Sequence, residues 1–248
     1  MCTLAVAFGS PAVPLIVAAN RDERLDRASR GPMLWAGPPR FVAPRDEVAG
    51  GTWLGLNEHG VFVGITNRAG TPPDPKRRSR GALVLDALRG HTAAETHAAL
   101  AEIGAEAHNP FHLLYADRHS AHLTWSDGST IHRADLEPGL TVVTERTPGV
   151  GPGNARTTRM HEAWKQLPPT RTGAPTPESV RALLSEHDHD HPLDAVCVHA
   201  DAVGYGTRSS MLLVMPNDPR QVELWWAEGK PCQTPFANES DLPQALFT

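Results

Sequence analysis

Two stretches near the start of the chain, MCTLAVAF (residues 1–8) and PLIVAANRDER (residues 14–24), decide how this protein folds. Each contains a short apolar run, Thr3–Phe8 and Leu15–Ala19, and the intervening Gly9-Ser10-Pro11 has the composition of a turn. The pattern predicts two antiparallel strands joined as a hairpin. Because a hairpin brings the end of its second strand beside the start of its first, residues 20–23 are expected to lie near Cys2.

Cys2 is open to two interpretations. It is either a small buried hydrophobe that opens the first strand, or a nucleophile. If the initiator methionine is removed, Cys2 gains a free α-amine, whose pKa of about 8 leaves it substantially deprotonated at neutral pH. One residue then supplies both a thiol and a base for it. A carboxylate and a guanidinium from Asn20-Arg21-Asp22-Glu23 would hold the amine and lower the pKa of the thiol.

The rest of the chain alternates strand pairs with helices. Thr52–Leu56 and Val61–Thr66 predict a hairpin in which Gly60 takes a positive φ, whereas the proline-rich residues 31–44 predict irregular structure. Further strands are predicted at Phe111–Ala116, His122–Trp125, Leu140–Thr144, Ala195–His199, Met211–Met215 and Val222–Trp226, and helices at Ser79–Leu88, 92–104, Ala155–Gln166 and 176–186. This is an α+β pattern of mostly antiparallel sheets covered by helices, in one domain spanning residues 1–248.

Composition excludes several classes of protein. The 248 residues are 40% hydrophobic and 21% charged, as expected of a globular domain, and the net charge of −5 gives no reason to expect a nucleic-acid partner. No apolar run is long enough to span a membrane, and no signal peptide precedes the first strand. Three scattered cysteines make no disulfide framework, so a cytoplasmic protein is expected.

Five ordered segments resemble the NRDE family, which includes eukaryotic transport and Golgi organisation protein 2. They are MCTLAVAF, AANRDE, GGTWLGLNEHGVFVGITN (residues 50–67), Arg80-Gly81 and YGTRSSMLLV (residues 205–214), and they run the length of the chain. The first three also look, more distantly, like the choloylglycine-hydrolase branch of N-terminal-nucleophile amidases. That resemblance implies a four-layer αββα sandwich with two mostly antiparallel sheets between helical layers.

The same resemblance implies a set of catalytic residues. Cys2 would attack an amide carbonyl, Arg21 and Asp22 would position its thiol and amine, and Asn67 would donate to the oxyanion. Residues expected to contact substrate are Asn20, Glu23, Trp53, Thr66, Glu145, Thr207 and Arg208. Glu145 departs from the pattern, because relatives have an asparagine there and a carboxylate cannot donate to an oxyanion.

Two classes of function follow from the resemblance. One is a hydrolase or acyl-transfer enzyme for an amide or acyl substrate, with Cys2 as nucleophile after removal of Met1. The other is a non-catalytic carrier of haem or of an acyl-lipid or acyl-CoA, because the eukaryotic relatives are associated with haem handling and lipid metabolism. The enzyme requires no cofactor; haem is a candidate ligand, for which the sequence singles out no axial residue. The oligomeric state is left open.

Two other patterns carry charge or metal-capable side chains. Residues 187–191 alternate histidine and aspartate before Pro192, and we interpret them as a solvated loop with adventitious metal affinity, so that no metal site is assigned. Residues 76–80 form a basic cluster, interpreted as a solvated helix start, with a clamp for a phosphate or CoA-like group as the alternative. Without interleaved aromatic residues the cluster does not predict a nucleic-acid site.

Overall fold

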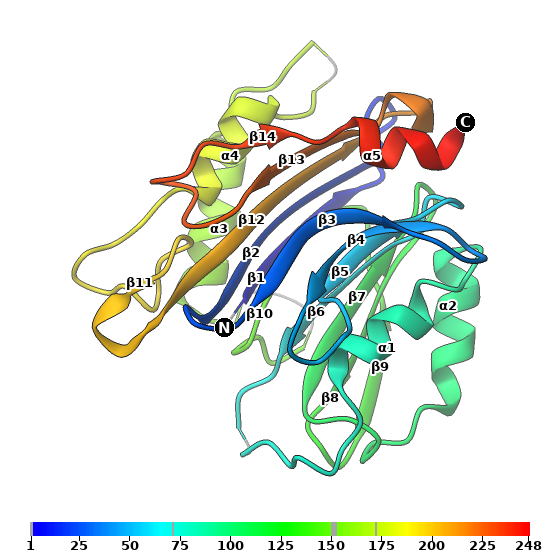
Figure 1. Ribbon diagram of the computed structural model, residues 1–248. Coiled ribbons are helices and arrows are strands. Elements are labelled where there is room, and N and C mark those ends of the chain that lie inside the picture. The colour runs from blue at the N-terminus through cyan, green and yellow to red at the C-terminus, as the bar shows by residue number, and fades with distance from the viewer. Residues whose placement is uncertain (1, 71, 150–152, 172) are drawn as a thin grey trace.

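Two seven-stranded antiparallel sheets face each other, and helices cover the outer side of each (Figure 1). The computed structural model describes residues 2–70, 72–149, 153–171 and 173–248. The first sheet has the order β10-β1-β2-β12-β13-β14, with β11 also paired to β12, and the second runs from β3 to β9 in chain order. The predicted αββα sandwich is therefore confirmed.

The first sheet consists of β1 (Cys2–Phe8), β2 (Leu15–Arg24), β10 (Gly139–Thr144), β11 (His199–Ala200), β12 (Tyr205–Met215), β13 (Glu223–Ala227) and β14 (Ala237–Asn238). The second consists of β3 (Ser29–Trp35), β4 (Phe41–Asp46), β5 (Leu54–Asn57), β6 (Phe62–Asn67), β7 (Phe111–Ala116), β8 (Ala121–Ser126) and β9 (Ile131–Asp135). The α-helices are α1 (Arg80–Ala87), α2 (Ala93–Ala99), α3 (Ala155–Gln166), α4 (Pro177–Leu184) and α5 (Asp241–Gln244).

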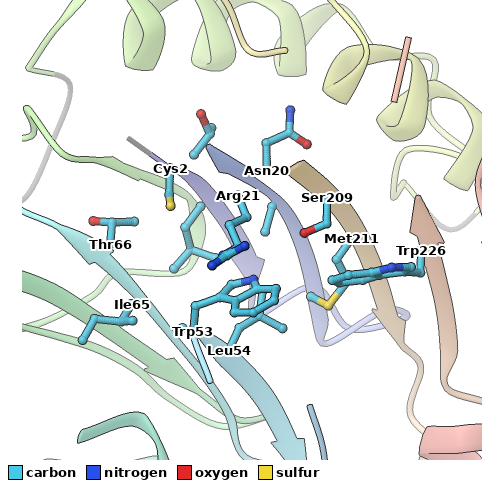
Figure 2. Close-up of a pocket in the computed structure, with 14 residues that line it drawn as sticks. Cys2, Asn20, Arg21, Trp53, Leu54, Ile65, Thr66, Ser209, Met211 and Trp226 are labelled. Carbon is cyan, nitrogen blue, oxygen red and sulfur yellow. The ribbon is translucent and has the colours of Figure 1, made fainter. Parts of the chain in front are cut away.

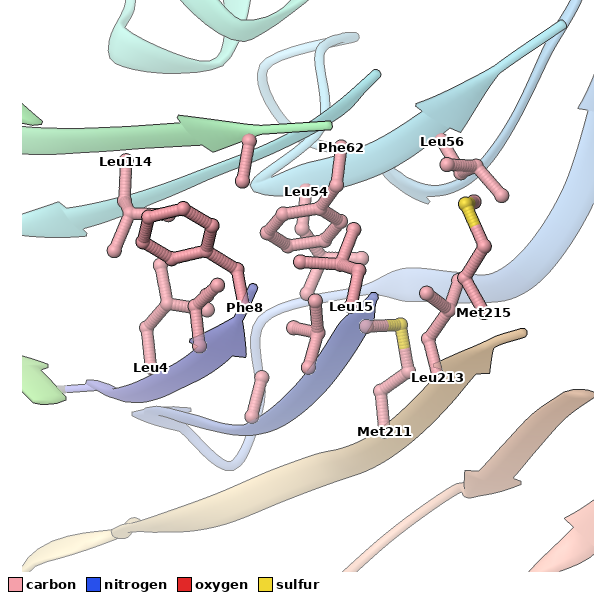
Figure 3. Packing of buried hydrophobic residues seen from close by; sticks show 14 of the residues in the cluster. Leu4, Phe8, Leu15, Leu54, Leu56, Phe62, Leu114, Met211, Leu213 and Met215 are labelled. Carbon is pink, nitrogen blue, oxygen red and sulfur yellow. The ribbon is translucent and has the colours of Figure 1, made fainter. Parts of the chain in front are cut away.

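Alternating side chains divide the interior into three apolar layers. Leu4 and Leu15 of the first sheet pack against Phe62 of the second in the central layer, which Figure 3 shows from close by. Residues of the opposite parity, such as Ala5 and Ile16, pack beneath α3 and α4. The outer face of the second sheet is covered by α1 and α2. Because β1 and β2 are buried on both faces, only their ends can present side chains to a cleft.

Several local predictions are confirmed. Gly60 takes φ 81° in the turn between β5 and β6, a conformation that glycine adopts without strain. The helix predicted at Ser79–Leu88 is α1, and the Ser79 side chain caps it by accepting a hydrogen bond from the Gly81 amide. The helix predicted at Ala155–Gln166 is α3, and Pro177 occupies the first turn of α4.

The prediction of irregular structure for residues 31–44 was wrong, because β3 and β4 run through them. β3 lies at the edge of its sheet and its register shifts between Arg30 and Met33, so Pro32 needs no ladder hydrogen bond. The strand predicted at Ala195–His199 was also largely wrong, since only His199 pairs there. Residues 195–198 are buried but have no regular secondary structure. Their apolar side chains are explained by this burial and did not indicate a strand. No helix among the described residues is long and apolar enough to cross a membrane.

Candidate active site

The predicted hairpin brings Cys2 and Arg21 side by side. β1 and β2 pair antiparallel in unbroken register, with Cys2 opposite Arg21 and Thr3 opposite Asn20. The sheet continues on the far side of β2, where Thr207 of β12 pairs with Asp22. The start of β1, the end of β2 and the start of β12 therefore lie together at one edge of the sandwich.

The strand alternation sends these side chains to opposite faces of the sheet. Cys2 and Arg21 point into the space between the sheets, toward Trp53, whereas Asn20 points to the helical side (Figure 2). The Arg21 guanidinium lies 4.1 Å from the centroid of the Trp53 ring, a cation–π contact. Its Nη2 atom is 3.4 Å from a carboxylate oxygen of Asp46. Arg21 is thus held from both sides in a nearly buried position.

Cys2 lines two neighbouring hollows. A small apolar cavity of about 10 Å³, room for about one water molecule, lies between the sheets beside Trp53 and Trp226. A polar cleft of about 210 Å³ opens outward from the same cysteine. Its lining includes both strand ends, the loop before β5 and the start of α1. A thiol at this junction can meet a polar group that enters from solvent.

Charged side chains dominate the wall of the cleft. Asp46 pairs with Arg27 as well as with Arg21, and Arg78 pairs with Asp86. Arg80 also lines the cleft, where its Nη1 atom donates to the carbonyl of Pro110. Within the described part of the chain, no carboxylate lies within ion-pair distance of Arg80. This guanidinium is therefore the lining cation best suited to an anionic group on a ligand.

A buried network holds Asp22 behind the cysteine. Its carboxylate accepts hydrogen bonds from Arg156 Nη1 at 3.2 Å and from the Thr207 hydroxyl at 2.7 Å, and its carbonyl accepts one from the Tyr205 hydroxyl. Burial raises the pKa of Asp22 to about 6, against the opposing charge of Arg156. The strand end that carries Arg21 is thereby fixed from the helical side.

Burial raises the pKa of the Cys2 thiol above its ordinary value, and Asp22 acts in the same direction while Arg21 opposes it. The Sγ atom lies 4.0 Å from the carbonyl oxygen of Asp22. At neutral pH this thiol is therefore mainly protonated. Nucleophilic attack would require a base to remove its proton.

The structure gathers only some of the predicted site residues around the cleft. Glu23, Trp53 and Asn67 line it together with Cys2, Arg21 and Asp22, and Thr66 lines the small cavity. Three others line neither hollow; they are Glu145, Thr207 and Arg208. Asn20 lines the small cavity and not the cleft. Met1, whose removal the sequence analysis requires, lies outside the described residues.

Those four residues contact the framework behind the site. Both hydrogens of the Asn20 amide are donated, to the carbonyls of Leu184 and Val196 at 2.9 Å each. Glu145 lies 3.9 Å from Arg156, and the Arg208 guanidinium donates to the carbonyl of Arg27. Thr207 bonds to Asp22, as described above. Their contacts are those of residues that position the strand ends.

The sequence analysis did not select Arg156 or Asp46. It named Arg80 as part of the Arg80-Gly81 segment and of the basic cluster 76–80, which it interpreted as a solvated helix start with an anion clamp as the alternative. Gly51 and Gly81 cross so closely that a Cβ on Gly51 would lie 2.7 Å from the Gly81 carbonyl carbon. This contact brings the start of α1 against the loop before β5 and so carries Arg80 to the cleft. Arg156 and Asp46 carried no local signal at all.

Two groups of side chains among the described residues have metal-binding geometry, and neither lines the cleft. One is His97, His122 and Asp135, and the other is His187, His199 and Cys232. In the first group His122 already bonds to Asp135 at 2.8 Å and to Ser120 at 3.0 Å. The chemistry available in the cleft itself is that of a thiol, guanidinium groups, carboxylates and an amide.

Sequence comparison identifies relatives of the chain. The model of a family described as Transport and Golgi organisation 2 matches residues 1–225. The Transport and Golgi organization 2 homolog of Mus musculus is 31% identical over 163 residues, which are 62% of this chain and 54% of the mouse protein. The homolog of Homo sapiens is 34% identical over 112 residues, 43% of this chain and 40% of the human protein. The matches thus span about half the length of these relatives.

Comparison with solved structures finds proteins of the same αββα architecture. A Caenorhabditis elegans ortholog of N-acylethanolamine-hydrolyzing acid amidase superposes with a TM-score of 0.58 at 14% identity, covering 86% of this chain and 92% of that one. A mutant of the conjugated bile acid hydrolase from Clostridium perfringens superposes with a TM-score of 0.53 at 12% identity, covering 97% and 93%. The fold is therefore that of N-terminal-nucleophile hydrolases.

Proposed function

The chain belongs to the Transport and Golgi organisation 2 family, and we propose that it is an N-terminal cysteine amidohydrolase for a small acyl amide. The observation that carries this proposal is the position of Cys2 at the junction of a polar cleft and the space between the sheets, in register with Arg21. The two structural neighbours, an acid amidase ortholog and a bile acid hydrolase, support it at the level of the fold.

The first step would use the α-amine that Cys2 gains when Met1 is removed. The amine takes the thiol proton, and Sγ bonds to the carbonyl carbon of the amide. Asn67, which lines the same cleft, would donate to the oxygen on which negative charge develops. The C–N bond then breaks, the leaving amine takes up the proton, and a thioester remains. Water hydrolyses the thioester to a carboxylic acid and restores the thiol.

A buried carboxylate, that of Glu145, lies near the backbone of Cys2, whose nitrogen becomes the α-amine when Met1 is removed. Thr3 pairs with Thr144, the last residue of β10, so Glu145 follows next to Cys2. Glu145 is 7% exposed, and its Oε2 atom lies 3.9 Å from Nη1 of Arg156 without a hydrogen-bond partner among the described residues. In this chain a carboxylate thus replaces the asparagine of relatives at a position where it would accept from the amine. We assign Glu145 to positioning the amine.

The acyl substrate would carry an anionic group. Arg80 lines the cleft without a carboxylate partner among the described residues, and it is the first residue of α1. A carboxylate or phosphate on the substrate would complete its hydrogen bonding. The wall formed by Trp53 offers apolar contact to an acyl chain at the same time.

The experiment compares three forms of the protein with an electrophilic amide-type probe, followed by a screen of N-acyl amides and acyl-CoA esters. We expect labelling at Cys2 in the wild type with Met1 removed, as verified by intact mass, and none in Cys2→Ser. The matched control carries an uncleavable N-terminal peptide, so that it has the same thiol but no α-amine on Cys2. Equal labelling of that control, or tight haem binding with no turnover of any acyl compound, would contradict the proposal, the latter in favour of a carrier.

A further inference from the structure

A second cluster of reactive side chains lies apart from the cleft, where the coil before β11 meets the turn after β13. Cys197 is fully buried, and Cys232 and His199 are half-buried. The Sγ atoms of Cys197 and Cys232 lie 3.6 Å apart, and the Nε2 atom of His199 lies 3.6 Å from the first and 3.0 Å from the second. These three side chains converge on one point from two separate segments.

His187 provides a fourth donor at the same place. Its ring centroid is 5.1 Å from that of His199, and its ligand atom lies within 4.8 Å of those of His199 and Cys232. His187 is exposed and belongs to the alternating segment 187–191, which the sequence analysis interpreted as a solvated loop. The fold brings the first histidine of that segment to within reach of His199 and Cys232.

The distances fit a tetrahedral metal ion. With zinc–sulfur bonds of about 2.3 Å and zinc–nitrogen bonds of about 2.0–2.1 Å, the edges of the tetrahedron are about 3.8 Å between sulfurs and about 3.6 Å between sulfur and nitrogen. The observed separations of 3.6 Å and 3.6 Å match these edges, and the shorter 3.0 Å separation needs only a small adjustment. Two thiolates with imidazole ligands select zinc among the common divalent ions.

We propose that Cys197, His199 and Cys232, with His187 as the fourth ligand, bind one zinc ion that cross-links the two segments. The site closes the tetrahedron with protein atoms, which is the arrangement of a structural site. It also lies next to the framework of the cleft, because the amide of Val198 donates to the Thr207 hydroxyl, which in turn donates to Asp22. The ion would hold this part of the chain in place and take no part in chemistry at Cys2.

The alternative to a metal site is a disulfide bond between Cys197 and Cys232. A disulfide has sulfurs about 2.0 Å apart, whereas here they are 3.6 Å apart with a histidine nitrogen beside both. A histidine in contact with both sulfurs has no role in a disulfide, and it is expected in a metal site. The geometry therefore favours the metal.

The test is titration of the full chain, reduced and freed of metal, with Co²⁺ as a spectroscopic probe. We expect one equivalent to bind with thiolate-to-cobalt charge-transfer and tetrahedral ligand-field absorption, and Zn²⁺ to displace it. Cys197→Ser and Cys232→Ser should each weaken binding at least about 100-fold, since even the loss of an outer partner costs about 10–100-fold. His187→Ala should weaken it less, because water can replace the exposed ligand.

His191→Ala is the matched control, since His191 is exposed and, among the described residues, its side chain pairs only with Asp188 of its own loop. It should bind Co²⁺ like the wild type, and so should Cys2→Ser, which separates this site from the proposed catalytic one. Because a serine variant can fail to fold, the wild type is also heated with and without a chelator, which should lower its Tm. Absence of stoichiometric Co²⁺ binding, binding that depends on His191 and not on the cysteines, or a Cys197–Cys232 disulfide in protein prepared without air would each overturn the proposal.

Discussion

Arg156 of α3 donates to the carboxylate of Asp22 at 3.2 Å, and the two side chains are 3% and 0% exposed. This buried ion pair joins the helical layer to the strand end that carries Arg21. Because both charges are desolvated, each depends on the other and on the hydrogen bond from Thr207. The position of Cys2 between the sheets thus depends on contacts made on the opposite face of its sheet.

Arg156→Met should destabilise the protein by about 3–5 kcal/mol, because it leaves the Asp22 carboxylate buried without its cation. The measurement is the free energy of unfolding by denaturant at pH 7. Arg24→Met is the control: it breaks the fully exposed Arg24–Asp26 pair and should leave that free energy unchanged. Equal effects of the two variants would contradict a structural role for the buried pair.

Cys2 should react with iodoacetamide increasingly fast as the pH rises through the alkaline range, because burial raises the pKa of its thiol. Arg21→Met should raise that pKa further and slow the reaction at a given pH, since the guanidinium favours the thiolate. The measurement is the rate of alkylation of the Cys2 peptide by mass spectrometry, with Arg24→Met as control. A profile shared by all three proteins would show that Arg21 does not act on the thiol.

Gly51→Ala should cost about 1–3 kcal/mol of stability, because its Cβ would lie 2.7 Å from backbone of Gly81 that cannot swing away. It should also slow probe labelling at Cys2, since both glycines line the cleft. Gly104→Ala, with nothing within 4 Å of its Cβ, is the matched control and should be neutral or slightly stabilising. Thermal unfolding of the two variants decides between a required close approach and a merely flexible loop.

His112 should make the protein less stable in acid. It is fully buried beside Thr66, and burial lowers its pKa to about 4 from an ordinary value of 6.5. Between pH 6.5 and 4 the histidine is therefore protonated in the unfolded chain but neutral in the folded protein. Its contribution to the free energy of unfolding is fully present above pH 6.5 and falls by about 3 kcal/mol as the pH falls toward 4. His112→Gln removes this titration.

As the pH is lowered from 7 to 4, the free energy of unfolding of the wild type should therefore fall by about 3 kcal/mol more than that of His112→Gln. Asp22, whose raised pKa acts in the opposite direction over the range from 3.8 to about 6, is present in both proteins and cancels in the comparison. Parallel curves for the two proteins would mean that His112 does not titrate in this range.

Much of the fold follows from local pattern. Short apolar runs and turn residues predicted the β1–β2 hairpin and the β5–β6 hairpin. An apolar stripe predicted α1, and an N-cap followed by proline predicted α4. Edge strands were harder: β3 contains proline and glycine, and β9 is short and partly exposed. An edge strand needs only one paired side and little burial, so its sequence carries a weaker signal.

The candidate site divides in the same way. The sequence alone determined that Cys2, Arg21 and Asp22 share one strand end, because a hairpin fixes its own register over a short loop. Only the tertiary structure decided that Arg156, 134 residues after Asp22, would form an ion pair with it and that Arg80 would line the cleft. The same is true of the contacts that His199 makes with Cys197 and Cys232. These contacts join elements from different layers, and their geometry is set by how whole sheets and helices pack, for which no short stretch of sequence carries the information.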